Sequence, residues 1–373
     1  MPQKLPQELV DQAIDHLWND RASLRSCSRV CRRWLPSART HLFRDQRLTS
    51  AKDCVRFEAL VKSSPEVASY VRKLAISETM SSMHAQHWLN RIPALVAQLP
   101  RLSTLELIGV RYPSLQSSSS ETLAALKRLT ALVFADVYFD SYMDLHTLLS
   151  AACDIKDLCF YRVSWMHPSY SPASAHPSLP VRSQAPLRRL VIDSWASSTM
   201  LREWLLPTAE HLDVRTLMVR WRERDCMDVL NALLKCCGAS LQNLYIELPT
   251  TMEESQELPS LYYSSGLRSL EIDGLVVPGC VAWTSALLAN LRAPFLEKLS
   301  ISLLLLNSSS LLSFNWANLD SVLSQPSFSG TTLKLNINLA LHTSNDPNAV
   351  RESLSGYLPD VARRGKLSIC CIG

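Results

Sequence analysis

The sequence predicts an α/β fold in which a short N-terminal helical module precedes an irregular solenoid of leucine-rich strands and helices. Leucine fills 63 of the 373 positions, and a Leu-x-x-Leu-x-apolar unit recurs at a steady interval after residue 70. Apolar stripes at helical spacing occupy the segments before and between these units. Glycine is scarce, at 9 residues, which argues against glycine-rich phosphate loops and the nucleotide-binding folds built on them.

Charge, apolar runs and cysteine usage narrow the class of protein further. Residues 1–50 hold nine Lys/Arg and five Asp/Glu, whereas the rest of the chain holds 29 of each sign. The broad basic stripe with interleaved aromatics that is typical of nucleic-acid-binding proteins is missing, so we expect no nucleic-acid partner. No apolar run approaches the ~18 residues of a membrane span, and the N-terminus lacks the apolar stretch of a secretory signal. With eleven cysteines and no Cys-x-x-Cys, we expect reduced thiols, a cytoplasmic or nuclear protein and no membrane partner.

Residues 4–48 carry the pattern of a small helical module. Pro6 suits the first turn of a helix, and the apolar stripe of that helix comprises Leu9, Ala13, Ile14 and Leu17. Asp20 is a plausible N-cap for a second helix, whose apolar face comprises Leu24, Cys27, Cys31, Trp34 and Leu35, with Val30 beside it. Pro36 should end or kink that helix, and a third helix could cover residues 37–43. Because so short a segment cannot bury a self-sufficient core, we expect the module to lean on the rest of the chain or on another protein.

The order of these residues resembles the F-box, as found in the large fungal F-box families. That motif opens with Leu-Pro-x-Glu-Leu and closes its second helix with Val-Cys-(Arg/Lys)-x-Trp, matched here by Leu5, Pro6, Glu8 and Leu9 and by Val30, Cys31, Arg32 and Trp34. The resemblance covers residues 1–48 and implies binding to a Skp-type adaptor and, through it, to a cullin. The adaptor-binding residues that it implies are Leu5, Pro6, Leu9, Ile14, Leu17, Leu24, Val30, Cys31, Trp34 and Leu35. The alternative is an ordinary helical cap on the repeats.

The repeated unit predicts a series of strands along residues 49–373. Its copies lie at 71–76, 102–107, 129–134, 155–160, 187–192, 214–219, 241–246, 267–272 and 296–301, with looser copies at 332–337 and 365–369. The second anchor leucines are residues 74, 105, 132, 158, 190, 217, 244, 270, 299, 335 and 367. Most are separated by about 26–32 residues, a period typical of leucine-rich repeats.

Amphipathic helices alternate with these strands. They are marked by Leu123, Leu126 and Leu129, by Leu145, Leu148, Leu149 and Ala152, by Val229, Leu230, Leu233 and Leu234, and by Leu287, Leu288 and Leu291. Strand alternating with helix at this period predicts a right-handed arc with a parallel concave sheet and outer helices. A globular α/β sheet with shuffled strands is the alternative.

Two features indicate that the repeats are irregular. The asparagine that usually hydrogen-bonds backbone at each turn is replaced, so we expect apolar packing at turn positions such as Val110, Val137 and Val163. Residues 164–186 are rich in proline, serine and alanine, which is typical of a flexible surface insertion.

The concave face of the sheet is the candidate surface for a protein partner. Because alternate residues of a strand point to opposite faces, pairs such as Cys159/Tyr161, Val191/Asp193 and Ser300/Ser302 should lie on the open concave side. Tyrosine and arginine often anchor protein interfaces. The candidate substrate-binding residues are therefore Tyr161, Arg220, Tyr245, Glu247, Glu271 and Asp273. We expect combined replacement of Arg220, Tyr245 and Glu271 by alanine to leave stability nearly unchanged, because it removes no core anchor.

Motifs of catalysis are missing from the sequence. It has no Gly-x-Ser-x-Gly elbow, His-Glu-x-x-His motif, phosphate loop or paired zinc ligands, so we expect no enzyme, no cofactor and no metal. The resemblance implies a substrate-recognition subunit of a Skp–cullin–F-box ubiquitin ligase that holds an unknown protein substrate. The alternatives are an interaction scaffold acting outside a ligase and an enzyme with a cryptic site.

Overall fold

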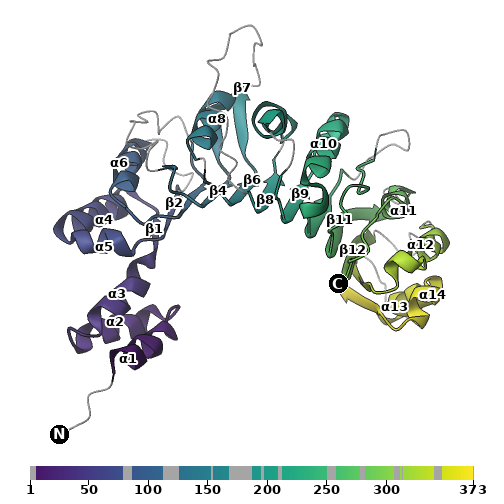
Figure 1. Ribbon diagram of the computed structural model, residues 1–373, viewed down its shortest axis with the longest axis horizontal. Helices are drawn as coiled ribbons and strands as arrows, with labels where there is room; N and C mark the ends of the chain where they lie inside the picture. The colour runs from purple at the N-terminus through teal and green to yellow at the C-terminus, as the bar shows by residue number, and fades with distance from the viewer. Residues whose placement is uncertain are drawn as a thin grey trace. The chain divides into compact units, whose positions relative to one another are not determined.

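The computed structural model describes residues 6–78, 86–111, 126–152, 154–167, 187–194, 197–208, 212–249, 258–277, 282–305, 311–312, 314–339 and 347–372. The chain divides into two compact units, Met1–Ala185 and Pro186–Gly373. The fold is mixed α/β, with twelve strands in parallel sheet, five of them from the first unit and seven from the second (Figure 1).

The first unit begins with three helices, α1 (Gln7–Asp15), α2 (Arg21–Val30) and α3 (Leu35–Arg44). Its sheet strands are β1 (Asp45–Leu48), β2 (Lys73–Ser77), β3 (Thr104–Ile108), β4 (Ala131–Ala135) and β6 (Asp157–Tyr161). Its other helices are α4 (Ala51–Ser63), α5 (Pro65–Tyr70), η1 (Gln86–Arg91), α6 (Ile92–Ala97) and α8 (Tyr142–Ala151). Two short strands, β5 (Tyr138–Ser141) and β7 (Ser164–His167), pair separately.

The second unit continues the alternation of strand and helix. Its strands are β8 (Arg189–Asp193), β9 (Thr216–Arg220), β10 (Asn243–Glu247), β11 (Ser269–Val277), β12 (Lys298–Leu305), β13 (Thr332–Leu339) and β14 (Leu367–Ile372). Its longer helices are α10 (Met227–Cys237), α11 (Ala282–Ala289), α12 (Trp316–Leu323), α13 (Pro347–Tyr357) and α14 (Pro359–Arg363). Short helical turns are α9 (Ser197–Met200), η3 (Leu201–Leu205), η4 (Leu206–Thr208), η5 (Arg224–Cys226), η6 (Gly238–Ser240) and η8 (Pro326–Phe328).

The strands predicted from the leucine-rich unit are all present, and their pairing within each unit is parallel. In the first unit Leu74, Leu105, Leu132 and Leu158 are in register, and in the second Leu190, Leu217, Leu244, Leu270 and Leu299 are in register. The assignment of Leu335 as the anchor of β13 was wrong. Leu333 takes that place, because it pairs in register with Leu299 of β12 and with Leu367 of β14. Leu333 and Leu335 face the same side of β13, so the sequence alone could not choose between them.

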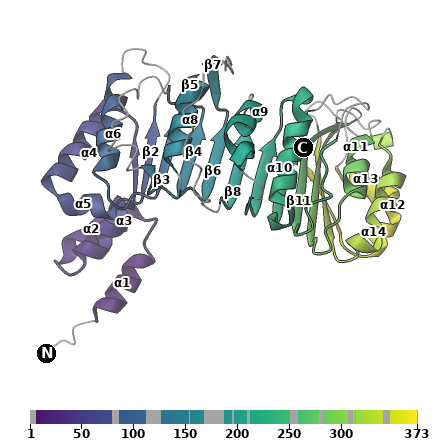
Figure 2. The ribbon, with the colours of Figure 1, turned by 45° about the horizontal axis from the view of Figure 1, so that its top comes forward.

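One face of the sheet is covered by helices in each unit (Figures 1 and 2). Predicted helical leucines such as Leu145, Leu148, Leu230 and Leu233 are buried there, which confirms the helices expected at these positions. Leu123 of the first expected helix lies outside the described residues. The other face carries no helix among the described residues of either unit, and alternate residues of β9 and β10 are half-buried on it.

Several positions expected to be open on the helix-free face are instead buried. Cys159, Val191, Asp193 and Ser302 have exposed fractions of 4%, 2%, 7% and 7%. Val191 lies in register with Met218 of β9, and Asp193 is held by arginines from the following strand and turn. Long side chains on one strand therefore cover short ones on the next, which alternation alone does not reveal.

The structure tests the expectation for the turns, but it describes only the first residues of the predicted insertion. Val110, Val137 and Val163 are each 1% exposed, which confirms apolar packing at these turns. Ser164–His167, the start of the predicted insertion, form strand β7 in parallel pairing with β5, and residues 168–186 lie outside the described residues.

Candidate functional site

The N-terminal module, comprising α1, α2 and α3, is the first candidate site. Its core consists of Val10, Ile14, Leu24 and Ala38, against which Leu17, Cys27, Trp34 and Leu42 pack. The buried stripe of α1 therefore runs through Val10 and Ile14, while Leu9 and Ala13 of the predicted stripe are exposed. The module has a small core of its own, which leaves other apolar side chains at its surface.

Polar contacts hold the three helices of the module together. His41 Nε2 lies 2.7 Å from Asp15 Oδ1, which joins α3 to α1. Ser37 Oγ donates to Asp11 Oδ1, and the hydrogen bonds from Ser37 and then from Gln7 lower the pKa of the Asp11 carboxyl. The predicted N-cap is confirmed, since Asp20 Oδ1 accepts from the backbone N–H groups of residues 22 and 23.

The predicted course of the second and third helices was wrong in one respect. Helix α2 ends at Val30, and Cys31 is extended, with φ −163° and ψ 168°. Pro36 lies in the first turn of α3, where its missing N–H costs no hydrogen bond, so it begins a helix instead of ending one. Cys31 and Trp34 therefore do not share one face of a single helix.

The residues implied to bind an adaptor fall into three groups in the structure. Pro6, Leu9, Val30 and Cys31 are exposed, with fractions of 50% for Leu9 and 59% for Val30. Leu17, Trp34 and Leu35 are half-buried, whereas Ile14 and Leu24 are buried in the core of the module, and Leu5 lies outside the described residues. We therefore assign Ile14 and Leu24 to holding the helices together.

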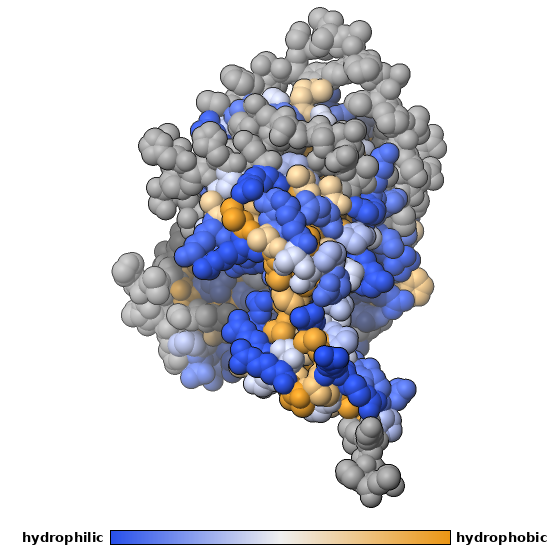
Figure 3. All heavy atoms as spheres, turned by 90° about the vertical axis from the view of Figure 1, so that its left-hand side faces the viewer, coloured by the Kyte–Doolittle hydropathy of each residue, from blue (hydrophilic) through white to orange (hydrophobic). Residues whose placement is uncertain are grey.

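The module also exposes a tryptophan. Trp18 is 63% exposed at the turn after α1. It was not among the predicted residues, although it lies four residues after Ile14 and is therefore in phase with the apolar stripe. Figure 3 shows hydrophobic residues gathered between hydrophilic ones on the side of the molecule that carries the N-terminal helices. Large exposed apolar side chains on one small module are the usual mark of a protein interface.

A polar cluster on the helix-free face of the second unit is the second candidate site. Arg220, Glu247 and Asp273 occupy one row across β9, β10 and β11, because Arg220 pairs in register with Glu247 and Glu247 with Asp273. Tyr245 lies one pleat earlier on β10, in register with Glu271 of β11. The prediction that Arg220, Tyr245, Glu247, Glu271 and Asp273 would lie on neighbouring strands is therefore confirmed.

The cluster is joined by short hydrogen bonds and ion pairs. Arg220 donates from Nε to Glu247 Oε2 and, over 3.1 Å, from a terminal nitrogen to Asp193 Oδ2. Arg222 donates to Asp193 Oδ1 over 3.1 Å, and Tyr245 donates to Asp273 Oδ2 over 2.8 Å. Asp193 and Arg222 were not among the predicted site residues, although the position of Asp193 at the end of its strand was a usable signal.

These contacts fix the protonation state of the central groups. Burial, followed by the hydrogen bond to Asp273, raises the pKa of the Tyr245 hydroxyl above its ordinary value. Burial lowers the pKa of the Arg220 guanidinium, but its partners Glu247, Tyr245 and Asp193 outweigh burial and raise it overall. Tyr245 is therefore a neutral hydrogen-bond donor and Arg220 a permanent cation.

The remaining predicted residues lie apart from this network. Glu271 is exposed on β11, and Tyr161 is half-buried on β6 of the first unit. In the cluster itself, two guanidinium groups are already matched by the carboxylates of Asp193 and Glu247. The cluster thus stabilises the face of the sheet and offers few unsatisfied groups to a partner.

We expect Asp193→Ala to destabilise the second unit. The change leaves Arg220 and Arg222 without their shared acceptor in a partly buried place, at a cost of about 1–3 kcal/mol in unfolding free energy. Thermal unfolding should show a melting temperature several degrees lower. Glu271→Ala is the matched control on the same face and should melt like the parent. Equal melting of both variants would contradict the prediction.

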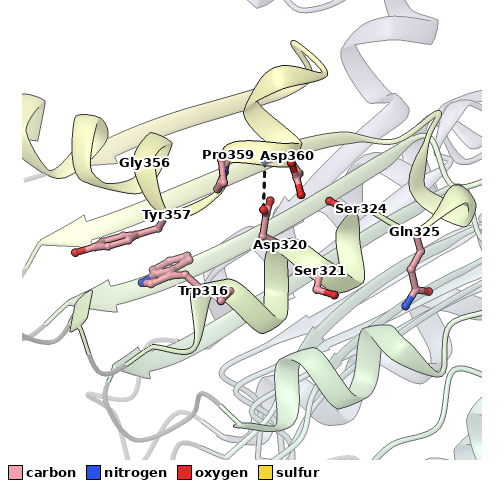
Figure 4. A pocket seen from close by; sticks show the side chains of 10 residues that line it. Trp316, Asp320, Ser321, Ser324, Gln325, Gly356, Tyr357, Pro359 and Asp360 are labelled. Atoms are coloured by element: carbon pink, nitrogen blue, oxygen red, sulfur yellow. Dashed lines mark hydrogen bonds between the residues drawn. The ribbon is translucent and has the colours of Figure 1, made fainter.

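A third feature is a pocket of about 560 Å³ between α12 and the turn joining α13 to α14 (Figure 4). Asp320 at its centre accepts from the backbone N–H groups of Asp360 and Val361 over 3.2 and 3.1 Å, which caps the start of α14. Trp316 donates from Nε1 to the Leu311 carbonyl over 2.7 Å, and its ring is stacked with that of Tyr357 at 6.1 Å. The polar groups of Asp320 and Trp316 thus serve the packing of helices.

Comparison with protein-family models finds no match for this chain, and comparison with curated proteins finds no similar sequence. Among the residues that the structure describes, no helix is long and apolar enough to cross a membrane. The same residues include no group of three or more His, Cys, Asp or Glu arranged to hold a metal ion.

Proposed function

We propose that this chain is the substrate-recognition subunit of a Skp–cullin–F-box ubiquitin ligase and acts in the cytoplasm or nucleus. One observation carries the proposal: the N-terminal module exposes Leu9 and Val30 at two positions of the F-box motif while it buries Ile14 and Leu24 in its own core. A folded module with exposed apolar anchors fits a surface made for a protein partner.

The remainder of the chain would hold the substrate. Leucines in register on neighbouring parallel strands, with a helix layer on one face, support a leucine-rich-repeat-like solenoid. Its contribution to ubiquitin transfer is proximity, because holding substrate and ubiquitin-loaded enzyme in one assembly raises their effective concentration. No bond is made or broken on this chain in that mechanism.

Co-purification of the tagged full-length chain tests the proposal. We expect a Skp-type adaptor and a cullin to be recovered together, and recovery of both to fall when residues 1–48 are removed. Recovery of the adaptor without a cullin would favour a scaffold acting outside a ligase. Recovery of neither would overturn the proposal.

Cysteine labelling provides a footprint of the same surface. Cys31 is exposed, whereas Cys54, Cys159 and Cys237 are buried, and burial raises the pKa of the Cys237 thiol to about 12. We expect iodoacetamide to modify Cys31 much faster than these three in the isolated chain, since the thiolate is the reactive form. Mass spectrometry should then show Cys31 protected once adaptor is bound. Unchanged labelling of Cys31 in the complex would place the adaptor elsewhere.

A further inference from the structure

Four exposed side chains from three successive repeats of the second unit form a continuous row. The Lys235 ammonium lies 5.7 Å from the centre of the Tyr263 ring, and the Arg292 guanidinium lies 4.3 Å from the centre of the Tyr262 ring. The two tyrosine rings meet edge to face at 5.2 Å. We call this set the cation–tyrosine row; its members are Lys235, Tyr263, Tyr262 and Arg292.

The row is exposed, and no acid among the described residues pairs with its charges. Tyr262 and Tyr263 are 44% and 48% exposed, and both cations are exposed. Within the described residues, no ion pair joins Lys235 or Arg292 to an acid, and Glu297 in the loop after Arg292 is engaged by Arg268 at 2.8 Å. In contrast to the cluster around Arg220, this surface has unused charge and unused aromatic area.

The loop that carries the two tyrosines is held in place by the protein. Asn231 of α10 donates to the Leu258 carbonyl over 3.3 Å and accepts from the Ser260 N–H over 2.7 Å. Leu261 and Ser264, on either side of the tyrosine pair, are fully buried. A side chain held in its binding position loses little entropy on association, so the row is prepared for a partner.

We propose that the cation–tyrosine row is the docking surface for an acidic peptide segment of a partner protein. Guanidinium and ammonium groups bind carboxylates through charge-assisted hydrogen bonds, and tyrosine and arginine are the residues that most often dominate protein interfaces. Phe295, three residues after Arg292 in the same loop, is 62% exposed and offers apolar surface to aliphatic side chains of that segment. Where the proposed function holds, this partner is the substrate, and the inference then names its chemistry.

The geometry favours a peptide over a nucleic acid. Single-stranded nucleic acid binds by stacking its bases on open aromatic faces, but Arg292 already covers one face of Tyr262 and Lys235 lies over a face of Tyr263. The row offers cationic N–H donors and tyrosine hydroxyl groups, of which that of Tyr262 accepts from Arg292 over 3.0 Å. Carboxylates match these groups better than bases do.

Fluorescence polarisation on the full-length chain tests the inference with three labelled probes: a short peptide of glutamate and leucine, its glutamine counterpart, and an oligothymidine of equal charge. We expect the glutamate peptide to bind in a salt-dependent manner and the other two to bind at least tenfold more weakly. Combined Lys235→Glu and Arg292→Glu should weaken binding of the glutamate peptide at least tenfold. The milder pair Lys235→Gln and Arg292→Gln should lose an intermediate amount of affinity. Lys334→Glu with Arg351→Glu makes the same charge change at exposed positions elsewhere in the unit and should retain most of the binding.

Three outcomes would overturn the inference: the glutamate peptide does not bind, oligothymidine binds more tightly than the peptide, or the control variant loses as much binding as the Lys235/Arg292 variant. The measurement needs no adaptor. A chain that binds the peptide but recovers no adaptor overturns only the proposed function, and a chain that recovers adaptor but binds no peptide overturns only this inference.

Discussion

Gly266→Ala is expected to unfold the second unit more readily than any other conservative change considered for this chain. A Cβ atom at this position would lie 2.0 Å from the Ala239 carbonyl oxygen and 3.0 Å from its carbon, both of which are backbone atoms of η6. Backbone atoms cannot rotate away, so the segment that leads into β11 through Leu267, which is fully buried, has to shift. We expect a loss of about 3 kcal/mol or more in unfolding free energy.

Thermal and urea unfolding measure this effect. A loss of that size should lower the melting temperature by roughly 6–12 °C for a unit of this length. Gly356→Ala is the matched control, because nothing lies within 4 Å of the added Cβ and residue 356 is inside helix α13. Alanine is the better helix former by about 1 kcal/mol, so the control should be as stable as the parent or slightly more so. A Gly266→Ala chain that melts with the control would show that η6 and β11 do not pack as described.

Leu9→Glu combined with Val30→Glu is expected to abolish adaptor binding while the chain stays folded. Both side chains are at least half exposed, at 50% and 59%, so neither change removes packing from the core of the module. Placing carboxylates in an apolar interface leaves them desolvated without partners. Truncating an interface anchor already costs ~2 kcal/mol, about thirty-fold in affinity, and charge at two anchors should cost more.

The control for this pair is Val55→Glu in helix α4, which changes another exposed valine, 47% exposed, outside the module. It should leave adaptor recovery in a pull-down unchanged. Trp34→Ala is a poorer test, because Trp34 packs against the module's own core and its loss would disturb folding as well as binding. Full recovery of adaptor by the folded Leu9/Val30 variant would refute the assignment of this surface.

Strand positions were predictable from local pattern, and their failures have identifiable causes. Paired leucine anchors with period-two alternation mark a buried strand, so each predicted strand is present. Strand β1 was missed because Asp45–Leu48 has three polar residues in four and pairs with β2 only through the fold around it. The boundary between α2 and α3 was missed because a proline that could end one helix instead begins the next.

Burial on the helix-free face was less predictable than strand position. Alternation assigns Val191 and Asp193 to that face, but it carries no information on the length of the side chains opposite. The arginines at 220 and 222 reach across and cover Asp193, which turns an expected recognition surface into a structural ion-pair network. We therefore expect replacement of Asp193 to lower stability.

The leucine repeat alone was enough to place the strands, the helix layer and the buried leucines, because those features depend on spacing within about thirty residues of chain. Packing between repeats decided which polar side chains meet. Lys235, the Tyr262–Tyr263 pair and Arg292 belong to different repeats and carry no common motif. They come into contact because parallel strands in register bring successive connecting segments side by side. The sequence pattern gives the period of the repeats. The contacts between side chains of neighbouring repeats form only when the strands are paired in register.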